Sequence, residues 1–428
     1  MPVRNIKVSN FKSFKNFELT LDDYNLIIGP NNSGKTNFVE AIKFFSDIVN
    51  RGLDAAISRQ GGIEYLRNQR LPKTTETKIE IVYEIKGRRP ISLFLRKQLI
   101  VGEKKIDTDS RLIPNNLKYV LGIKGSRNKQ RYLITQETLE IEGELSERFK
   151  PASDLGKMAI RFERKQQVFD ASAKYKDKGE ESNWQEIPPN FYGIPRRVLD
   201  LTDSIFDSKR ISMPFILFDA RSLVGKFSVY NIDPRLPKKA VPVIGNNFLE
   251  EDGSNLAIIL TNILRNKESR RLLSIHLKDL LPFSSDLSDL KILDKTIMFK
   301  LVENYGKTKL AMPSSLISDG TINILALIIS LYFQNDDLVV IEEPERNIHP
   351  ALISKLVKLL LESSKKKQII VTTHSPELLR KSPLSNDILI KRDEDGFSVP
   401  FRVSEGEVAK RFLEDEVGVD VLFINELL

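Results

Sequence analysis

The start of the chain combines two stretches of alternating hydrophobic and polar residues with one short apolar stretch. Val3 to Val8 and Phe17 to Leu21 alternate, which is typical of strands with one buried face. Asn25 to Ile28 is apolar apart from its first residue and leads directly into a loop that contains glycine. The pattern predicts a helix after this loop, because apolar residues recur at helical spacing at Phe38, Ala41, Ile42 and Phe45.

The middle of the chain changes from strand-like to helical periodicity. From about Thr77 to Val168, alternating runs are separated by clusters of glycine, asparagine and lysine, which favours an antiparallel sheet. Between Asp252 and Leu281 the apolar residues fall on one face of a helix. We expect the polar residues Asp252 to Asn255 to cap the start of this helix.

The last third of the chain alternates between predicted helices and short apolar strands. Ile322 to Phe333 and Ala351 to Glu362 have the pattern of helices, the first of them apolar on all sides. Leu338 to Ile341 and Gln368 to Thr372 have the pattern of buried strands. Apolar strands separated by helices indicate a parallel sheet that is covered on both faces.

Composition narrows the class of protein. The chain has 428 residues, of which 41% are hydrophobic and 29% charged, as expected for a globular protein. It has no cysteine, which excludes disulfides and thiolate metal sites and favours the cytoplasm. Its apolar stretches are too short to span a bilayer, so we expect no membrane association. The net charge of +8 favours a partner that carries phosphates, DNA or RNA above all.

The loop after the first apolar strand has the pattern of a phosphate-binding loop. Its glycines let the backbone curl so that N–H groups converge on phosphate oxygens, and the following helix adds its positive end. Lys35 would reach the outer phosphates, and the hydroxyl of Thr36 would bind Mg²⁺. The predicted ATP-binding residues here are Gly29, Asn31, Asn32, Ser33, Gly34, Lys35, Thr36 and Asn37.

Two glutamates and a histidine follow the apolar strands of the last third. Glu342 and Glu343 end one strand, and His374 follows the next strand through two threonines. Because the carboxyl ends of parallel strands meet at one edge of the sheet, these side chains should lie near a bound ligand. Glu342 is placed to hold Mg²⁺, Glu343 to orient or deprotonate water, and His374 to contact the terminal phosphate.

The order of motifs resembles the ABC-type ATPases of the SMC, RecF and OLD group, a set of AAA-type P-loop proteins. The similarity rests on Asn10 to Phe14 before the glycine loop and on the sequences around Glu342, His349 and His374. It also rests on the segment Ser318 to Thr321. The fold class that this implies is α/β: a P-loop ABC-type ATPase head with an antiparallel β subdomain and a helical insertion.

The resemblance implies further site residues and a dimer. In such ATPases a serine–glycine signature caps the ATP of the opposite protomer, and Ser318, Asp319 and Gly320 match that signature. ATP would then hold a homodimer together, with a higher oligomer left open. The resemblance also places Lys12 and Ser13 beside the nucleotide.

Two features depart from the family pattern. Glu342 stands where aspartate is commoner, and its longer side chain would change the metal geometry. The glutamine loop of the family has no clear counterpart, although Gln60 and Gln69 are candidates.

The motifs divide the chain into three expected regions. Residues 1–185 form an ATPase lobe with the glycine loop and a β-rich subdomain, and residues 186–310 form a mostly helical insertion. Residues 311–428 form the lobe with the signature, the carboxylate pair and the histidine. An insertion is required because Lys35 and Glu343 lie near opposite ends of the chain, yet both must contact one nucleotide.

The function that these patterns favour is Mg²⁺-dependent ATP hydrolysis by a dimeric switch that acts on DNA, or on a DNA-acting partner, in DNA repair or anti-phage defence. We expect no nuclease in this chain, because the segment after His374 is short, and therefore a separate nuclease or effector protein. An alternative is the ATPase subunit of a membrane transporter. A kinase or a GTPase-like switch is a third possibility, which would lack the signature and the histidine.

Overall fold

The alternating stretches at the start of the chain form neighbouring strands in the computed structural model. β1 (Val3–Phe11) and β2 (Phe14–Thr20) pair antiparallel, and β1 also pairs with β4 (Thr77–Glu84). The turn between β1 and β2 is shorter than the pattern indicates, because the strands leave only Lys12 and Ser13 between them. Both Asn10 and Lys12 have positive φ, which lets the chain reverse in so few residues.

The structure describes residues 2–403 apart from several stretches, and the chain within this range forms two compact units. The stretches outside the description are 86–89, 93–98, 102–103, 107–109, 127–131, 147–155, 166–167, 177–183, 188–210, 214–215, 219–222, 244–247, 283, 293–295 and 306–307. Unit 1 comprises Met1–Asp22, Thr36–Gly225 and Arg392–Pro400, and unit 2 comprises Asp23–Lys35, Lys226–Lys391 and Phe401–Leu428.

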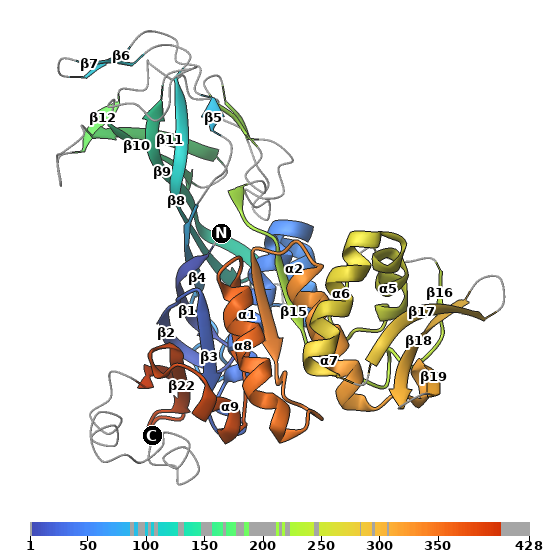
Figure 1. Cartoon of the computed structure of the whole chain (residues 1–428). Coiled ribbons are helices and arrows are strands. Elements are labelled where there is room, and N and C mark those ends of the chain that lie inside the picture. Colours follow the sequence, from blue (N-terminus) through green and yellow to red (C-terminus); the bar gives the residue numbers. More distant parts are fainter. Residues whose placement is uncertain are drawn as a thin grey trace. The chain divides into compact units, whose positions relative to one another are not determined.

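Unit 1 is built around a large antiparallel sheet with the strand order β12-β11-β10-β9-β8-β4-β1-β2 (Figure 1). The alternating middle of the sequence supplies most of these strands, which confirms the predicted antiparallel β subdomain. Their bounds are β8 Arg111–Gly125, β9 Tyr132–Ser146, β10 Lys157–Lys165, β11 Val168–Lys176 and β12 Gln185–Ile187; the short β5 (Ile91–Ser92) pairs with β8. Further short strands are β6 Leu99–Val101, β7 Lys104–Ile106, β13 Ile211–Met213 and β14 Ile216–Phe218.

The helix predicted after the glycine loop covers this sheet. It is α1 (Lys35–Arg51), and its apolar face is buried at Phe38, Ala41, Ile42 and Phe45. The ring of Phe45 lies 5.8 Å from Tyr83 and 5.6 Å from Tyr119, so aromatic contacts join helix and sheet. Two short helices follow it, α2 (Leu53–Arg59) and α3 (Ile63–Leu66).

Unit 2 contains a parallel sheet made from strands that lie far apart in the sequence. β15 (Phe227–Tyr230), β20 (Leu338–Glu342), β21 (Gln368–Thr372), β3 (Tyr24–Ile28) and β22 (Asp387–Arg392) lie in that order and pair in parallel. All residues of β3 and β21 are buried. The predicted parallel sheet is confirmed, and its carboxyl edge collects the ends of β3, β20 and β21. β23 (Ser398–Arg402) follows β22 in the chain.

Helices of unit 2 pack on this sheet and share its hydrophobic core. α7 (Asp319–Tyr332) is buried from Ile322 to Leu331, as expected of a helix that is apolar on all sides. α8 (Ile353–Ser364) buries one face, and α9 (Pro376–Lys381) follows β21. Short turns of 3-10 helix lie at Ser314–Leu316, Pro350–Leu352 and Leu384–Asn386.

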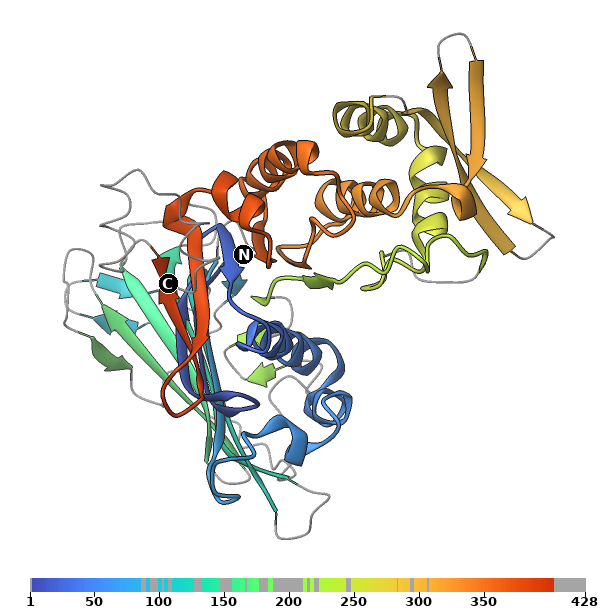
Figure 2. The same ribbon diagram turned by 90° about the horizontal axis from the view of Figure 1, so that it is seen from below.

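The central stretch of the sequence holds strands as well as the expected helices. α5 (Leu256–Arg265) and α6 (Lys267–Leu280) form in the helical stretch, separated by Asn266, whose side chain caps α6. They pack against an antiparallel sheet of β16 (Val241–Pro242), β17 (Ser284–Ile292), β18 (Thr296–Tyr305) and β19 (Thr308–Pro313) (Figure 2). Within residues 186–310, the described part therefore contains both helices and strands, whereas the sequence predicted a mostly helical region. Residues 188–210 lie outside the description.

The two units interleave along the sequence and do not follow the consecutive ranges 1–185, 186–310 and 311–428. The reason is that β3 and the glycine loop belong with the parallel sheet of the distant chain half. Among the residues that the structure describes, no helix is both long enough and apolar enough to cross a membrane.

Candidate nucleotide site

The glycine loop is shaped by backbone conformations that few side chains permit. Gly29 follows β3, and a Cβ atom here would collide with the carbonyl oxygen of Ile390. Asn32 and Gly34 have positive φ, and the N–H of Ser33 donates to the carbonyl of Pro30. Such a curled loop before a helix turns its N–H groups inward, which suits a phosphate. Asn31 and Asn32 are exposed at its rim.

The amine of Lys35 is buried among backbone carbonyl groups and has no carboxylate partner among the described residues. It donates hydrogen bonds to the carbonyls of Gly29 at 2.7 Å and Pro30 at 2.9 Å, and the residue is 7% exposed. Burial lowers the pKa of Lys35 to about 8, against the opposing field of Glu343. No described carboxylate lies within ion-pair distance of this amine. A desolvated cation of this kind fits a polyanionic phosphate chain.

The carboxylate of Glu343 lies at the carboxyl end of β20, and the turn there is held by the neighbouring strand. Glu342 pairs with Thr372 in the sheet, and the N–H of Glu343 donates to the carbonyl of Thr372 at 2.8 Å. Glu343 has φ 47°, a conformation that non-glycine residues seldom adopt and that is common at functional sites.

His374 lies between Lys35 and Glu343. Its Nδ1 is 3.4 Å from the Lys35 amine, and its Nε2 is 3.6 Å from Oε1 of Glu343. Burial, with a further contribution from Lys35, lowers the pKa of His374, so its imidazole is neutral near neutral pH. The structure thus brings together these three predicted residues from distant segments of the sequence.

Two side chains that sequence reasoning missed support this triad. Arg346 contacts Oε2 of Glu343 through Nε at 3.1 Å and Nη2 at 2.5 Å, which leaves Oε1 facing His374. Glu345 accepts a hydrogen bond from the hydroxyl of Thr373, which in turn accepts from the N–H of Ser375. The sequence signal available was the spacing of Glu343 and Arg346, since charges three positions apart can meet in a turn.

The signature residues lie at the exposed start of α7. Ser318 caps the helix by accepting from the N–H of Thr321, and Asp319 pairs with Lys238 at 2.5 Å. Gly320 leaves no space for a side chain, because a Cβ atom there would collide with the carbonyl oxygen of Asn347. Ser318 therefore serves as a helix cap, and close backbone packing explains the glycine at position 320.

The other predicted ATP contacts belong to unit 1. Asn37 donates from Nδ2 to the hydroxyl of Ser13 at 2.7 Å, and Lys12 lies 3.7 Å from Glu40. Thr36 is exposed at the start of α1. The glutamine candidates make other contacts, since Gln60 donates to Glu40 and Gln69 accepts from Arg67.

The residues present fit Mg²⁺–ATP. The hydroxyl of Thr36 and the carboxylate of Glu342 are oxygen donors, which Mg²⁺ prefers, and such a site commonly takes its remaining ligands from phosphates and water. No group of three or more histidine, aspartate or glutamate side chains suited to hold a metal occurs among the described residues.

Similar proteins were found at the level of sequence and of structure. Endonuclease GajA of Bacillus cereus (strain VD045) is 25% identical over 396 residues, which cover 89% of this chain and 56% of that protein. An uncharacterized protein of Methanocaldococcus jannaschii is 30% identical over 99 residues, 22% of this chain and 12% of that one. The chain thus spans about half, or much less, of the curated relatives it matches.

Solved SMC head domains resemble the structure over most of their length. The SmcHead bound to the C-winged helix domain of ScpA has a TM-score of 0.48 at 16% identity, covering 94% of this chain and 97% of that one. The SMC head domain from Thermotoga maritima has a TM-score of 0.43 at 13% identity, covering 94% and 99%.

A family model described as "AAA domain, putative AbiEii toxin, Type IV TA system" matches residues 24–380. This match includes the glycine loop, the signature, the carboxylate pair and His374. With the predicted α/β fold and its antiparallel subdomain confirmed, the chain belongs to this family of AAA ATPase domains.

Proposed function

We propose that this chain binds Mg²⁺–ATP at the glycine loop and hydrolyses it with Glu343 and His374. The observation that carries the proposal is the contact of His374 with both Lys35 and Glu343. A phosphate-binding amine, a neutral imidazole and a carboxylate within one small space are the groups that ATP hydrolysis requires.

The geometry gives each side chain a task. Lys35, a buried cation, neutralises the outer phosphates, and Mg²⁺ held at this site would supply further positive charge to them. Glu343 orients a water molecule and takes its proton through Oε1, since Arg346 holds Oε2. His374 donates a hydrogen bond to the terminal phosphate. Thr36 and Glu342 would hold the metal, while Lys12, Ser13 and Asn37 would contact the nucleotide.

The active form in this proposal is a homodimer in which Ser318, Asp319 and Gly320 cap the partner's ATP. Ser318 is exposed, and Leu316 beside it is 71% exposed, as suits a surface that a partner covers. The start of α7 also directs its positive end outward, where it can meet a terminal phosphate. Higher assemblies of such dimers are compatible with this arrangement.

The proposed target of the switch is DNA, or a nuclease or other effector that acts on DNA, in repair or in anti-phage defence. The net charge of +8 supports a phosphate-bearing partner. The similarity to Endonuclease GajA supports a nuclease context, although this chain spans 56% of that protein. The absence of cysteine supports a cytoplasmic location.

The test is the steady-state rate of phosphate release by the wild-type chain and by Lys35→Ala, with and without DNA. The wild type should hydrolyse ATP and respond to DNA, whereas Lys35→Ala should bind no ATP at micromolar concentration. Tight ATP binding by Lys35→Ala would contradict the assignment of the glycine loop. A wild-type rate that ignores single-stranded and duplex DNA alike would contradict the assignment of the target.

A further inference from the structure

Unit 1 contains a basic cavity that is lined by no residue of the Lys35 triad, although two of its lining residues, Lys12 and Ser13, are also proposed nucleotide contacts. Its volume is about 330 Å³, which lies within the range of ligand-binding pockets. Three segments distant in the sequence form it: the turn between β1 and β2, the segment after α3, and the turn between β22 and β23. The lining side chains that matter here are Lys12, Tyr65, Arg67, Arg70 and Arg392.

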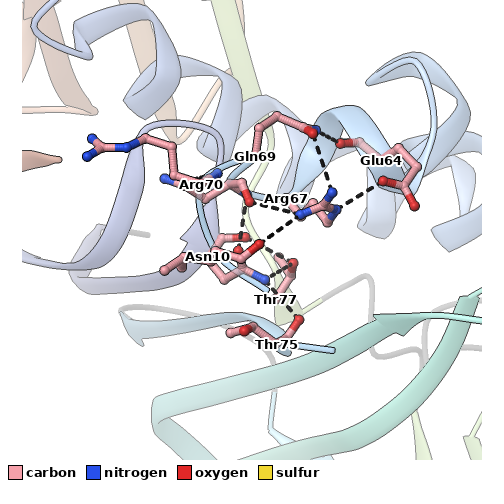
Figure 3. A network of polar contacts seen from close by, with 9 residues as sticks. Asn10, Glu64, Arg67, Gln69, Arg70, Thr75 and Thr77 are labelled. Carbon is pink, nitrogen blue, oxygen red and sulfur yellow. Dashed lines mark hydrogen bonds and ion pairs between the residues drawn. The ribbon is translucent and has the colours of Figure 1, made fainter. Parts of the chain in front are cut away.

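The wall of this cavity is held by a network of hydrogen bonds centred on Asn10 (Figure 3). Nδ2 of Asn10 donates to the carbonyl of Thr75 and to the hydroxyl of Thr77, while its Oδ1 accepts from the N–H of Asn68. Oδ1 of Asn68 then accepts from the N–H of Arg70. The backbone that carries Arg70 is therefore fixed before any ligand arrives, which lowers the entropic cost of binding.

The charges of the cavity are positive and only partly balanced. Arg67 pairs with Glu64 at 3.0 Å and Lys12 with Glu40 at 3.7 Å. Arg70 has no ion pair with any described residue; its guanidinium lies 4.5 Å from the ring centre of Phe397 and points away from the Asn10 network (Figure 3). No described carboxylate lines the cavity.

The same ring supports a second cation, and an aromatic side chain stands at the edge of the cavity. The amine of Lys15 lies 5.2 Å from the ring centre of Phe397, so two cations contact this one ring. Tyr65 lines the cavity and is 72% exposed, an unusual position for a large aromatic residue without a partner to stack on it. Cations beside an exposed aromatic ring are the combination that binds single-stranded nucleic acid.

We propose that this cavity binds a single-stranded segment of nucleic acid. A backbone phosphate would lie between Arg70 and Arg392, and an unpaired base would stack on Tyr65. The inference deepens the proposed function, because it gives the ATP-driven switch a contact with DNA. Its test residues, Arg70 and Tyr65, belong neither to the Lys35 triad nor to the proposed nucleotide contacts, so the two assignments can fail separately.

The experiment measures fluorescence anisotropy of a labelled oligothymidylate of about 12 nucleotides, and of a duplex of the same length, without ATP. The wild type should bind the single strand more tightly than the duplex. Arg70→Glu should weaken this binding at least about tenfold, and Arg70→Gln should reduce the dependence of log K on log salt by about one. Tyr65→Ala should weaken it about fivefold or more, whereas Tyr65→Phe keeps the stacking face and should bind like the wild type.

Lys309→Glu is the matched control, because it makes the same change of charge at an exposed position of unit 2. It should change affinity less than about twofold, which separates a local contact from the general effect of charge. Because the side chain of Tyr65 is mostly exposed, Tyr65→Ala should not disturb folding. A loss of oligonucleotide affinity in this variant would therefore reflect a lost contact.

Three results would overturn the inference: unchanged affinity in both Arg70→Glu and Tyr65→Ala, equal losses in Lys309→Glu and Arg70→Glu, or no binding of the oligonucleotide by the wild type. Loss of fluorescent ATP binding in Arg70→Glu, with oligonucleotide binding intact, would also overturn it and assign the cavity to the nucleotide. Failure of the proposed hydrolysis would appear separately, as a wild type that binds the oligonucleotide but releases no phosphate.

Discussion

Lys35 is a buried amine, and we expect that it must be protonated for ATP to bind. Its pKa is lowered to about 8 by burial, and bound phosphates would raise that pKa again. Between the two values, ATP binding must be accompanied by proton uptake. The affinity for ATP should therefore be constant below about pH 8 and fall about tenfold per pH unit above it. Titration with a fluorescent ATP analogue across this range measures the effect.

Titration of the neighbouring His374 should not interfere with this prediction. Because the pKa of His374 is lowered, its imidazole is neutral above about pH 8, where the affinity should fall, and it adds no change of charge there. Lys35→Ala should bind weakly at every pH. An affinity of the wild type that stays level up to about pH 10 would show that the amine does not carry the interaction.

Thr373 ties the loop of His374 to the turn that contains Glu343. Its hydroxyl donates to Glu345 and accepts from the N–H of Ser375, and the residue is fully buried. Thr373→Val keeps the shape but loses both bonds, so His374 should lose its fixed position. We expect the kcat of ATP hydrolysis to fall about tenfold with little change in ATP affinity, because one positioning contact contributes about 1–2 kcal/mol.

The same measurements on Thr373→Val can show that the hydrogen bonds of Thr373 have only a structural role. If Thr373→Val lost ATP affinity and kcat in parallel with its melting temperature, the bond would be structural only. A Thr373→Ser variant keeps the hydroxyl and should retain most of the turnover. Comparing the two separates the loss of the hydrogen bonds from the change in packing.

At the scale of elements, β22 begins with a carboxylate in an unfavourable place. Asp387 is 1% exposed, neither of its carboxylate oxygens has a hydrogen-bond partner among the described residues, and burial raises its pKa to about 8. The folded form therefore holds a proton that the unfolded form releases above about pH 4. Stability should decrease as the pH rises from about 4 to about 8, by at most about 6 kcal/mol from this group.

Asp387→Asn removes the titration while keeping the shape. The melting temperature of this variant relative to the wild type should increase between about pH 5 and about pH 8, where the wild type must either hold a proton or bury a charge. Thermal unfolding at the two pH values gives the difference directly. A difference that is the same at both values would mean that Asp387 has a partner in solution.

The sequence predicted most elements around the site and few of the contacts between them. The apolar strands Leu338–Ile341 and Gln368–Thr372 and the helix after Lys35 follow from periodicity alone. The break at Asn266 did not, because a single capping side chain interrupts an otherwise continuous helical pattern. The bond between Arg346 and Glu343 depends on the positive φ of Glu343, which no pattern of residue types reveals.

At the scale of the whole molecule, ATP should join two copies of the chain. Glu343→Gln should bind ATP but hydrolyse it very slowly, so its dimer should accumulate. Light scattering should give a mass near twice the 48.9 kDa of the monomer with ATP, and less with ADP. The expected cause is the cap that Ser318 and the start of α7 provide to the partner's nucleotide.

Ser318→Arg provides the control for this dimer. Its long side chain lies on the exposed start of α7, so binding of ATP by each copy should remain while closure of the dimer fails. The double variant with Glu343→Gln should therefore stay at the monomer mass in ATP. A full dimer of that double variant would place the interface elsewhere on the molecule.

The central claim is that Lys35, His374 and Glu343 form one hydrolytic site, and single-turnover hydrolysis by Glu343→Gln tests it most directly. With enzyme in excess over labelled ATP, the variant should bind ATP as the wild type does and release phosphate at least about a hundredfold more slowly. Phosphate release at the wild-type rate by Glu343→Gln would contradict the account.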